Sequence, residues 1–122
     1  MKYVLEFEIE DLPRTYNSLG RSHWTVKAKE ARKWISLVLS QCYQQRPPKP
    51  LQKARLILIR ASSSSPDADG LVSSFKHVID GLVKASILVN DKFENIGMPE
   101  YKWEKVPKNQ GKIKVKVEEI EN

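Results

Sequence analysis

Two aspartates, Asp67 and Asp69, stand on either side of Ala68, directly after an apolar run and at the start of a helical pattern. Carboxylates this close together are typical ligands of a divalent metal ion, because magnesium binds a few carboxylate oxygens and keeps several waters. Without a cation the two charges would repel each other. In the simpler alternative, one aspartate caps the helix and the other is exposed to solvent.

A helix starting at Asp69 would place two further charged residues beside this pair. Lys76 and Asp80 follow Asp69 by seven and eleven residues, so on one continuous helix all three lie along the same side. Lys76 could then neutralise negative charge on a phosphate. The alternative is an exposed helix pair between Lys76 and Asp80, which stabilises a helix by only about 0.3 kcal/mol.

A third carboxylate, Asp91, follows the helix next to Asn90. On its own this dipeptide is typical of a turn. Together with the preceding residues it completes a longer run, PDADGLVSSFKHVIDGLVKASILVND, from Pro66 to Asp91. This run resembles the signature of the RusA family of Holliday junction resolvases, in which an Asp-x-Asp pair precedes a helix with Lys and Asp-Gly-Leu or Asp-Ala-Leu, and an acidic pair follows.

The amino-terminal part of the chain is also similar to this family. The segment LPRTYN at residues 12–17 is followed by Arg21, His23 and Trp24, which resemble the family's region of Pro, Asn, basic and aromatic residues. The resemblance therefore covers nearly the whole chain. It implies a RusA-like fold and a symmetric homodimer that resolves Holliday junctions and related branched DNA in recombination and repair, with two equivalent sites for two matched cuts.

The resemblance also implies a role for each residue of the site. Asp67, Asp69 and Asp91 would bind Mg²⁺, or alternatively Mn²⁺, and Lys76 would be the basic residue needed for cleavage. Asp80 would support them. A magnesium ion held by carboxylates can activate a bound water and stabilise the charge that develops on phosphorus, which suits phosphodiester hydrolysis.

Three departures from the family pattern bear on this assignment. Gly70 stands where many members have Asn, and Asn90 replaces the first acid of the final pair. Lys76 follows the second aspartate by seven residues, where the shorter family form has four. Counting four residues from Asp69 places Ser73 at the position of the family lysine. Aligning backward from Asp80 instead places Lys76 at that position. Three extra residues are nearly one helical turn, so the Lys76 side chain would point to nearly the same side of the helix as the family lysine.

The apolar pattern predicts an α+β fold with a small mixed sheet and two main helices, in the order strand, helix, strand, helix, strand, strand. Alternation predicts a strand at residues 3–9, and an apolar run predicts a strand covered on both faces at 55–61. Spacings of three and four predict helices at 22–45 and from 69 to about 86. A hairpin with its turn at 107–111 completes a single domain of 122 residues.

Two expectations concern how these elements pack. The first helix is expected to turn one apolar face to the core, formed by Ala28, Ala31, Ile35, Val38, Leu39 and Cys42. The first and last strands carry complementary charges and are expected to pair, through Glu6, Glu8 and Glu10 on one and Lys112, Lys114 and Lys116 on the other. The alternative is two separately solvated faces.

A net charge of +6, from 21 Lys and Arg against 15 Asp and Glu, favours a polyanionic partner. Contacts to the DNA backbone are expected from Arg14, Asn17, Arg21, His23, Lys27, Lys29, Arg32 and Lys33. The alternative for these residues is a solvated charged surface. His23 and His77 each lack a second histidine at ligand spacing, so exposed or DNA-facing roles are favoured over metal binding.

The chain contains no apolar run of membrane-spanning length and no secretory pattern at its amino terminus, so we expect a cytoplasmic protein of a bacterial or phage-infected cell. Two other functions fit the same residues. A basic DNA-binding dimer without cleavage activity is consistent with Gly70 and Asn90. An interaction protein, whose acids only cap helices and form ion pairs, would not bring Asp67, Asp69 and Asp91 together.

Overall fold

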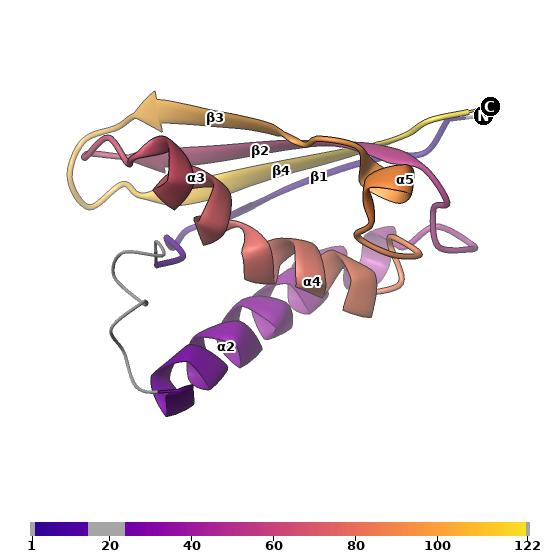
Figure 1. Ribbon diagram of the computed structural model, residues 1–122, viewed down its shortest axis with the longest axis horizontal. Helices are drawn as coiled ribbons and strands as arrows, with labels where there is room; N and C mark the ends of the chain where they lie inside the picture. Colours follow the sequence, from indigo (N-terminus) through magenta and orange to yellow (C-terminus); the bar gives the residue numbers. More distant parts are fainter. Residues whose placement is uncertain (1, 15–23, 122) are drawn as a thin grey trace.

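Four strands form one mixed sheet, and the described helices pack against only one of its faces (Figure 1). The computed structural model describes residues 2–14 and 24–121. The strands are β1 (Val4–Ile9), β2 (Ala54–Ser62), β3 (Glu100–Lys105) and β4 (Lys112–Glu119). Their order is β1-β4-β2-β3, with β4 antiparallel to β1 and β2, and β3 parallel to β2. The α+β class and the small mixed sheet are confirmed.

The expected pairing of the first and last strands is confirmed. In the antiparallel register of β1 and β4, Glu6 lies opposite Lys116 and Glu8 opposite Lys114. Ion pairs join Glu8 to Lys112 at 2.8 Å and Glu6 to Lys116 at 3.5 Å. The hydrogen bond between Glu8 and Lys112 lowers the pKa of the glutamate and raises the pKa of the lysine. The two charged rows therefore bind each other across the open face of the sheet.

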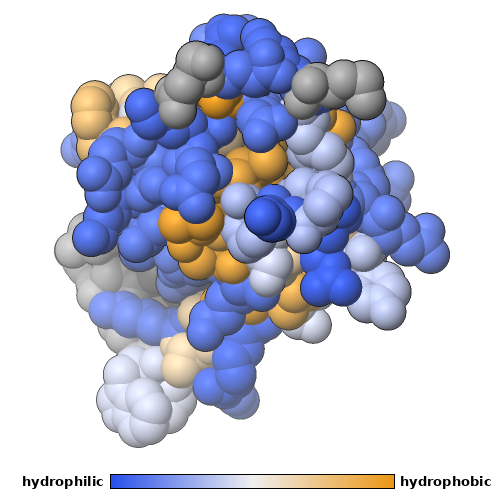
Figure 2. All heavy atoms as spheres, turned by 90° about the vertical axis from the view of Figure 1, so that its right-hand side faces the viewer, coloured by the Kyte–Doolittle hydropathy of each residue, from blue (hydrophilic) through white to orange (hydrophobic). Residues whose placement is uncertain are grey.

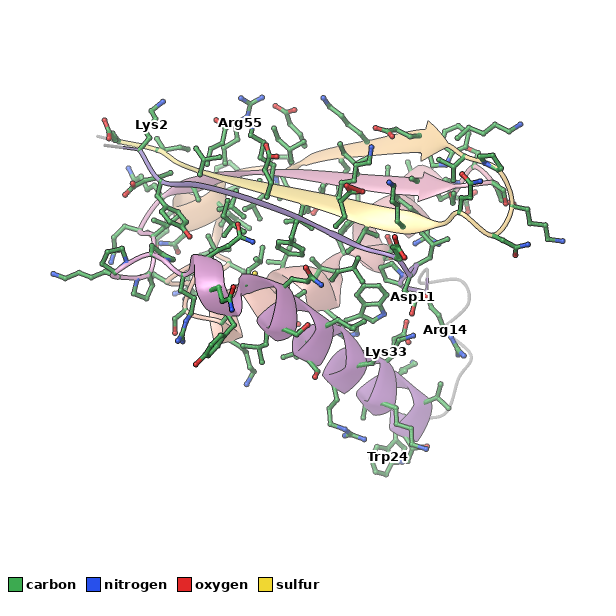
Figure 3. The ribbon with its side chains drawn as sticks, turned by 180° about the vertical axis from the view of Figure 1, so that it is seen from behind. Lys2, Asp11, Arg14, Trp24, Lys33 and Arg55 are labelled. Atoms are coloured by element: carbon green, nitrogen blue, oxygen red, sulfur yellow. The ribbon has the colours of Figure 1, made fainter. Side chains whose placement is uncertain are left out.

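Strand β2 is central in the sheet but is covered on one face only, so the expectation of two covered faces is wrong. Leu56 and Leu58 point toward the helices and are fully buried. Ile57 and Ile59 point the other way and stay partly exposed, because no described helix covers that face. Arg55 also projects from the open face (Figure 3). The apolar run thus reflects a half-covered central strand.

The last two strands do not form the expected hairpin. Both β3 and β4 pair with β2, one on each side of it, so residues 106–111 connect strands that are not neighbours. The physical reason is that β2 is the most apolar strand and gains most by having a neighbour on both edges. In this connection, a side chain at Gly111 would collide with Leu12, whose Cδ1 would lie 2.6 Å from the added Cβ.

Helix α2 (Trp24–Cys42) is followed by one 3-10 turn (Tyr43–Gln45), in agreement with the helix expected to end at residue 45. Its buried side chains are Trp34, Val38 and Cys42. The expected face is therefore displaced, because it omitted Trp34 and included Leu39, which is 40 % exposed. Val38 and Cys42 follow Trp34 at spacings of four, so the side of the helix that carries the large indole faces the sheet. None of the described helices has the length and apolar character needed to cross a membrane.

The second helix is broken in two, which the sequence did not predict. Helices α3 (Ala68–Ser74) and α4 (Lys76–Lys84) meet at Phe75. The Ser74 hydroxyl donates to the Leu71 carbonyl at 2.8 Å, and the Phe75 N–H instead bonds the Val72 carbonyl at 3.2 Å. Serine hydroxyls that bond a carbonyl one turn back are known to bend helices.

Burial of Phe75 accompanies this break. The Phe75 ring is fully buried and lies 6.1 Å from the ring of Tyr101 on β3, centroid to centroid. Beyond the break, α4 turns to run along α2 (Figure 1). A short helix, α5 (Phe93–Ile96), then leads into β3.

Close packing of α4 on α2 depends on Gly81, and substitution by alanine should destabilise the fold. A Cβ at this position would lie 2.8 Å from the Cβ of Val38. Overpacking costs about 1–3 kcal/mol, which exceeds the roughly 1 kcal/mol that alanine gains over glycine in a helix. Urea unfolding should show a lower free energy of unfolding for Gly81→Ala. Lys84→Ala, at an exposed position of the same helix, is the control and should change it by less than about 0.5 kcal/mol. A stabilised Gly81→Ala protein would contradict the packing described.

Candidate functional site

Asp67 and Asp69 lie where β2 passes into the helical layer. Asp67 is the residue before α3 and has an extended backbone, while Asp69 lies in the first turn of the helix. Both side chains are exposed, and the Asp67 carboxylate makes no capping hydrogen bond. The positive end of the helix backbone favours negative charge at both positions. The two aspartates therefore lie where capping residues are found, but Asp67 forms no capping hydrogen bond.

The loop before these aspartates is held by a chain of hydrogen bonds. The Ser62 hydroxyl, at the end of β2, donates to the Ser64 carbonyl at 2.7 Å. It also accepts a 3.0 Å hydrogen bond from the indole Nε1 of Trp103 on β3. Strands β2 and β3 together thus fix the point from which α3 begins.

Lys76 begins α4 and forms an ion pair with Asp80 one turn later, as the simpler helix-pair interpretation expects. Its Nζ lies 3.2 Å from Oδ1 of Asp80, and 65 % of the lysine side chain is exposed. The second oxygen of Asp80 lies 3.7 Å from Nδ1 of His77. That Nδ1 atom is buried and has no hydrogen-bond partner in the described part of the chain. Asp80 therefore faces two basic groups, and Lys76 keeps its charged end in solvent.

The break at Phe75 separates Asp69 from Lys76. The expectation that Asp69, Lys76 and Asp80 share one side assumed a continuous helix, and that assumption is wrong. Ser73, the alternative to the lysine, lies on α3, and its hydroxyl donates to the Gly70 carbonyl at 3.2 Å. A hydroxyl used in this way cannot replace a cation.

Asp91 is an exposed residue of the loop between α4 and α5, whose earlier residues Ile87 and Leu88 are buried. The backbone N–H of Asp91 donates to the side-chain oxygen of the preceding residue, Asn90, at 2.8 Å, but neither residue lies in a turn, so the turn expected as the simpler alternative is not found. Asp91 also lines a hollow of about 280 Å³ together with Lys76, Phe93 and Tyr101. The structure thus brings Asp91 to the same hollow as Lys76, although fifteen residues separate them in the chain.

The donor set suits magnesium chemically, but its geometry in one chain is incomplete. Among the described residues, no group of three or more His, Cys, Asp or Glu side chains could hold a metal ion. Asp67, Asp69 and Asp91 therefore do not form a closed three-carboxylate site in the single chain. Two of them share the start of α3, and the third lies beside Lys76.

The expected DNA contacts fall on α2 and the segment before it. Lys27, Lys29 and Arg32 are exposed on this helix. Arg14 is exposed, and its backbone N–H donates to Glu30 at 2.9 Å, which holds it close to α2 (Figure 3). The expected contacts Asn17, Arg21 and His23 lie outside the described residues.

Lys33 differs from the other basic residues of α2. Its Nζ lies 2.7 Å from Oδ2 of Asp11, and Figure 3 shows Asp11, just beyond the end of β1, above Lys33 on α2. Hydrogen bonds from Lys33 and from the Leu12 N–H lower the pKa of Asp11, although burial opposes them as the largest single influence. Lys33 thus joins the helix to the sheet and is the least available of these residues for DNA.

Of the residues that line the hollow, the sequence analysis selected only Lys76 and Asp91, and it missed the two aromatic residues, Phe93 and Tyr101. Phe93 follows Asp91 by two residues and is 75 % exposed. Its signal in the sequence was an isolated aromatic residue among polar ones, which does not distinguish a core residue from a surface one. Tyr101 falls in the first strand of the expected hairpin. Which face of the sheet its side chain would occupy depended on how β3 pairs, and the sequence did not predict that pairing.

No protein-family model matches the chain, and no curated protein matches it.

The separation of the carboxylates predicts weak metal binding by the protein alone. Sites with few charged ligands in place bind divalent cations with dissociation constants of roughly 0.1–1 mM or weaker. Magnesium titration of the DNA-free protein, followed by NMR, should give an affinity no tighter than this. A single tight site with a dissociation constant near or below about 1 µM would contradict the separated arrangement.

Proposed function

We propose that the chain is a magnesium-dependent endodeoxyribonuclease that cuts Holliday junctions and related branched DNA. The observation that carries the proposal is the meeting of Lys76 and Asp91 at one hollow, with the lysine held by Asp80 and exposed to solvent. A cation positioned in this way is suited to a phosphate group. The RusA-like run from Pro66 to Asp91, with its exposed Asp67, supports the same reaction.

Each side chain would have a separate task. Asp80 positions Lys76, because an ion pair one turn along a helix limits where the amino group can go. Lys76 stabilises the negative charge that builds up on the phosphate during cleavage. Mg²⁺, or Mn²⁺ in its place, when bound by Asp67, Asp69 and Asp91, would supply an activated water and further charge stabilisation. In this proposal the three carboxylates complete their site only with DNA bound.

The charge distribution supports DNA binding on the helical side. Ion pairs on the open face of the sheet join five acidic side chains to five basic ones, so their charges cancel. The acidic ones are Glu6, Glu8, Glu100, Glu104 and Glu118, and the basic ones are Arg55, Lys102, Lys112, Lys114 and Lys116. The net charge of +6 must therefore come from the rest of the chain. A polyanion is attracted to that excess.

A second copy of the chain and a cytoplasmic location are part of the proposal. Resolution of a four-way branch needs two matched cuts, and a two-fold homodimer provides two equivalent sites. DNA in a bacterial or phage-infected cell is cytoplasmic. Light scattering on the purified protein would measure the oligomeric state directly.

A second candidate function is a basic DNA-binding dimer that does not cut. One observation favours it, namely that no three-carboxylate group is assembled among the described residues. Both candidates predict binding to branched DNA, and only the first predicts cleavage. The variants below separate them.

Asp69→Asn should bind four-way junctions normally but fail to cut them. The substitution removes a proposed metal ligand, whereas affinity for DNA comes mainly from phosphate contacts elsewhere. Gel-shift binding and single-turnover cleavage in magnesium, measured on the same labelled junction, test this pair of expectations. Normal cleavage by the variant would show that Asp69 is not part of the catalytic site.

Lys76→Ala should slow the cleavage step by roughly 10²–10³-fold while junction affinity stays nearly unchanged, because its contact is strongest in the transition state. Lys84→Ala removes an exposed lysine from the other end of α4 and is the matched control. Ser73→Ala tests the alternative register and should cost little. Single-turnover rates of the three variants decide the matter. Fast cleavage by Lys76→Ala together with slow cleavage by Ser73→Ala would reverse the assignment.

A further inference from the structure

The hollow beside Lys76 presents an aromatic ring that the proposed cleavage step does not use. Phe93, at the start of α5, is 75 % exposed, and Met98, just after this helix, is 76 % exposed. Figure 2 looks at the end of the molecule that carries α5 and the chain termini, and it shows hydrophobic residues at the centre of a hydrophilic face. Of these two exposed side chains, only Phe93 lines the hollow.

Phe93 is presented by a segment that is fixed to the body of the protein. Ile96 of the same short helix is buried, and the Asn95 side-chain nitrogen donates to the Gln52 carbonyl at 2.9 Å. The helix ends at Gly97, whose N–H donates to the Phe93 carbonyl at 2.8 Å and whose φ is +57°. An L-residue is strained at that φ, so Gly97 suits the sharp turn into β3. The exposure of Phe93 is therefore built into the fold.

The size and walls of the hollow restrict what can occupy it. Its volume of about 280 Å³ lies just below that of most small-molecule sites, so it can hold one small group. Ile79, Ile96 and Pro99 form apolar walls. The exposed ring of Phe93 beside these walls suits a flat group that can stack on it.

The charges at the hollow favour a neutral occupant that carries hydrogen-bond donors. Lys76 and Asp91 bring one positive and one negative charge to the hollow, so an occupant without net charge suits it, while the exposed lysine side chain can meet a phosphate outside it. A carboxylate has two oxygens, so Asp91 can bind the proposed metal ion with one of them and accept a hydrogen bond from an amino group with the other. Tyr101 lines the same space, and burial raises the pKa of its hydroxyl, so the group stays protonated and can donate. Nucleobases are flat and neutral, and most carry an amino group beside ring acceptors.

We infer that this hollow binds one unpaired nucleobase of branched DNA, stacked on Phe93, next to the phosphate that Lys76 contacts. The inference rests on the proposed function and adds a residue that would select branched over fully paired DNA. A base at a branch point can leave the stack cheaply, whereas a base within a duplex must first be unpaired. Stacking on an exposed aromatic side chain depends little on which base is present.

The test uses a four-way junction with 2-aminopurine, a fluorescent base, at a branch-point position. Binding of the wild-type protein should change the emission of this base as it moves onto Phe93. Phe93→Ala should abolish that change and weaken junction affinity about tenfold, whereas Phe93→Trp should preserve both. Tyr43→Ala is the matched control, because Tyr43 is a similarly exposed aromatic residue, at 68 %, outside the hollow. Because Phe93 is so exposed, its removal should leave the circular dichroism spectrum and the unfolding midpoint unchanged.

The outcomes distinguish this inference from the proposed function. Loss of the emission change only in Phe93→Ala supports the inference, even when the wild-type protein does not cut the junction in magnesium; in that case only the nuclease proposal fails. Wild-type cleavage with an unchanged emission, or with equal emission changes in Phe93→Ala and wild type, overturns the inference and leaves the nuclease proposal intact. Equal losses of the emission change in Phe93→Ala and Tyr43→Ala also overturn the inference.

Discussion

The central place of β2 in the sheet is the constraint on which the remaining structure depends. Its apolar residues pair with β4 on one edge and β3 on the other, and its inner face supports the helices. The carboxyl end of β2 then fixes where α3 begins, and so where Asp67 and Asp69 lie. The start of β3 beside it fixes Tyr101, against which Phe75 packs at the break between α3 and α4. Core packing and site geometry are therefore set by the same strand.

Much of the fold could be predicted because its signals are local. Alternation in β1 and the charge match with β4 predicted both the strand and its partner, and the spacing of apolar residues predicted α2. The hairpin of β3 and β4 could not be excluded from sequence, because which strand pairs with β2 depends on contacts between distant segments. The break at Phe75 was missed because two serine hydroxyls compete with the helix backbone, an effect that apolar periodicity does not record.

The candidate site, like the fold, could be predicted only where its signals are local. The residue types at Asp67, Asp69, Lys76 and Asp91 could be selected from their spacing and from the RusA resemblance. Their arrangement could not, because it depends on the bend at Phe75 and on the path of the loop that returns Asp91 to the hollow. Phe93 shows the same limit, since only the folded chain reveals that an aromatic ring remains exposed beside a lysine. The ion pair of Lys76 and Asp80 was local and was correctly anticipated as the simpler alternative.

Cleavage of a four-way junction by the wild-type protein tests the central claim most directly. The junction would carry a label on each strand in turn, and the reaction would be run with Mg²⁺, with Mn²⁺ and with a chelator. The account predicts paired cuts at symmetric positions on opposite strands, only when a divalent metal is present. A junction that the protein binds but leaves intact in both metals would contradict nuclease activity and support the non-cutting DNA-binding function.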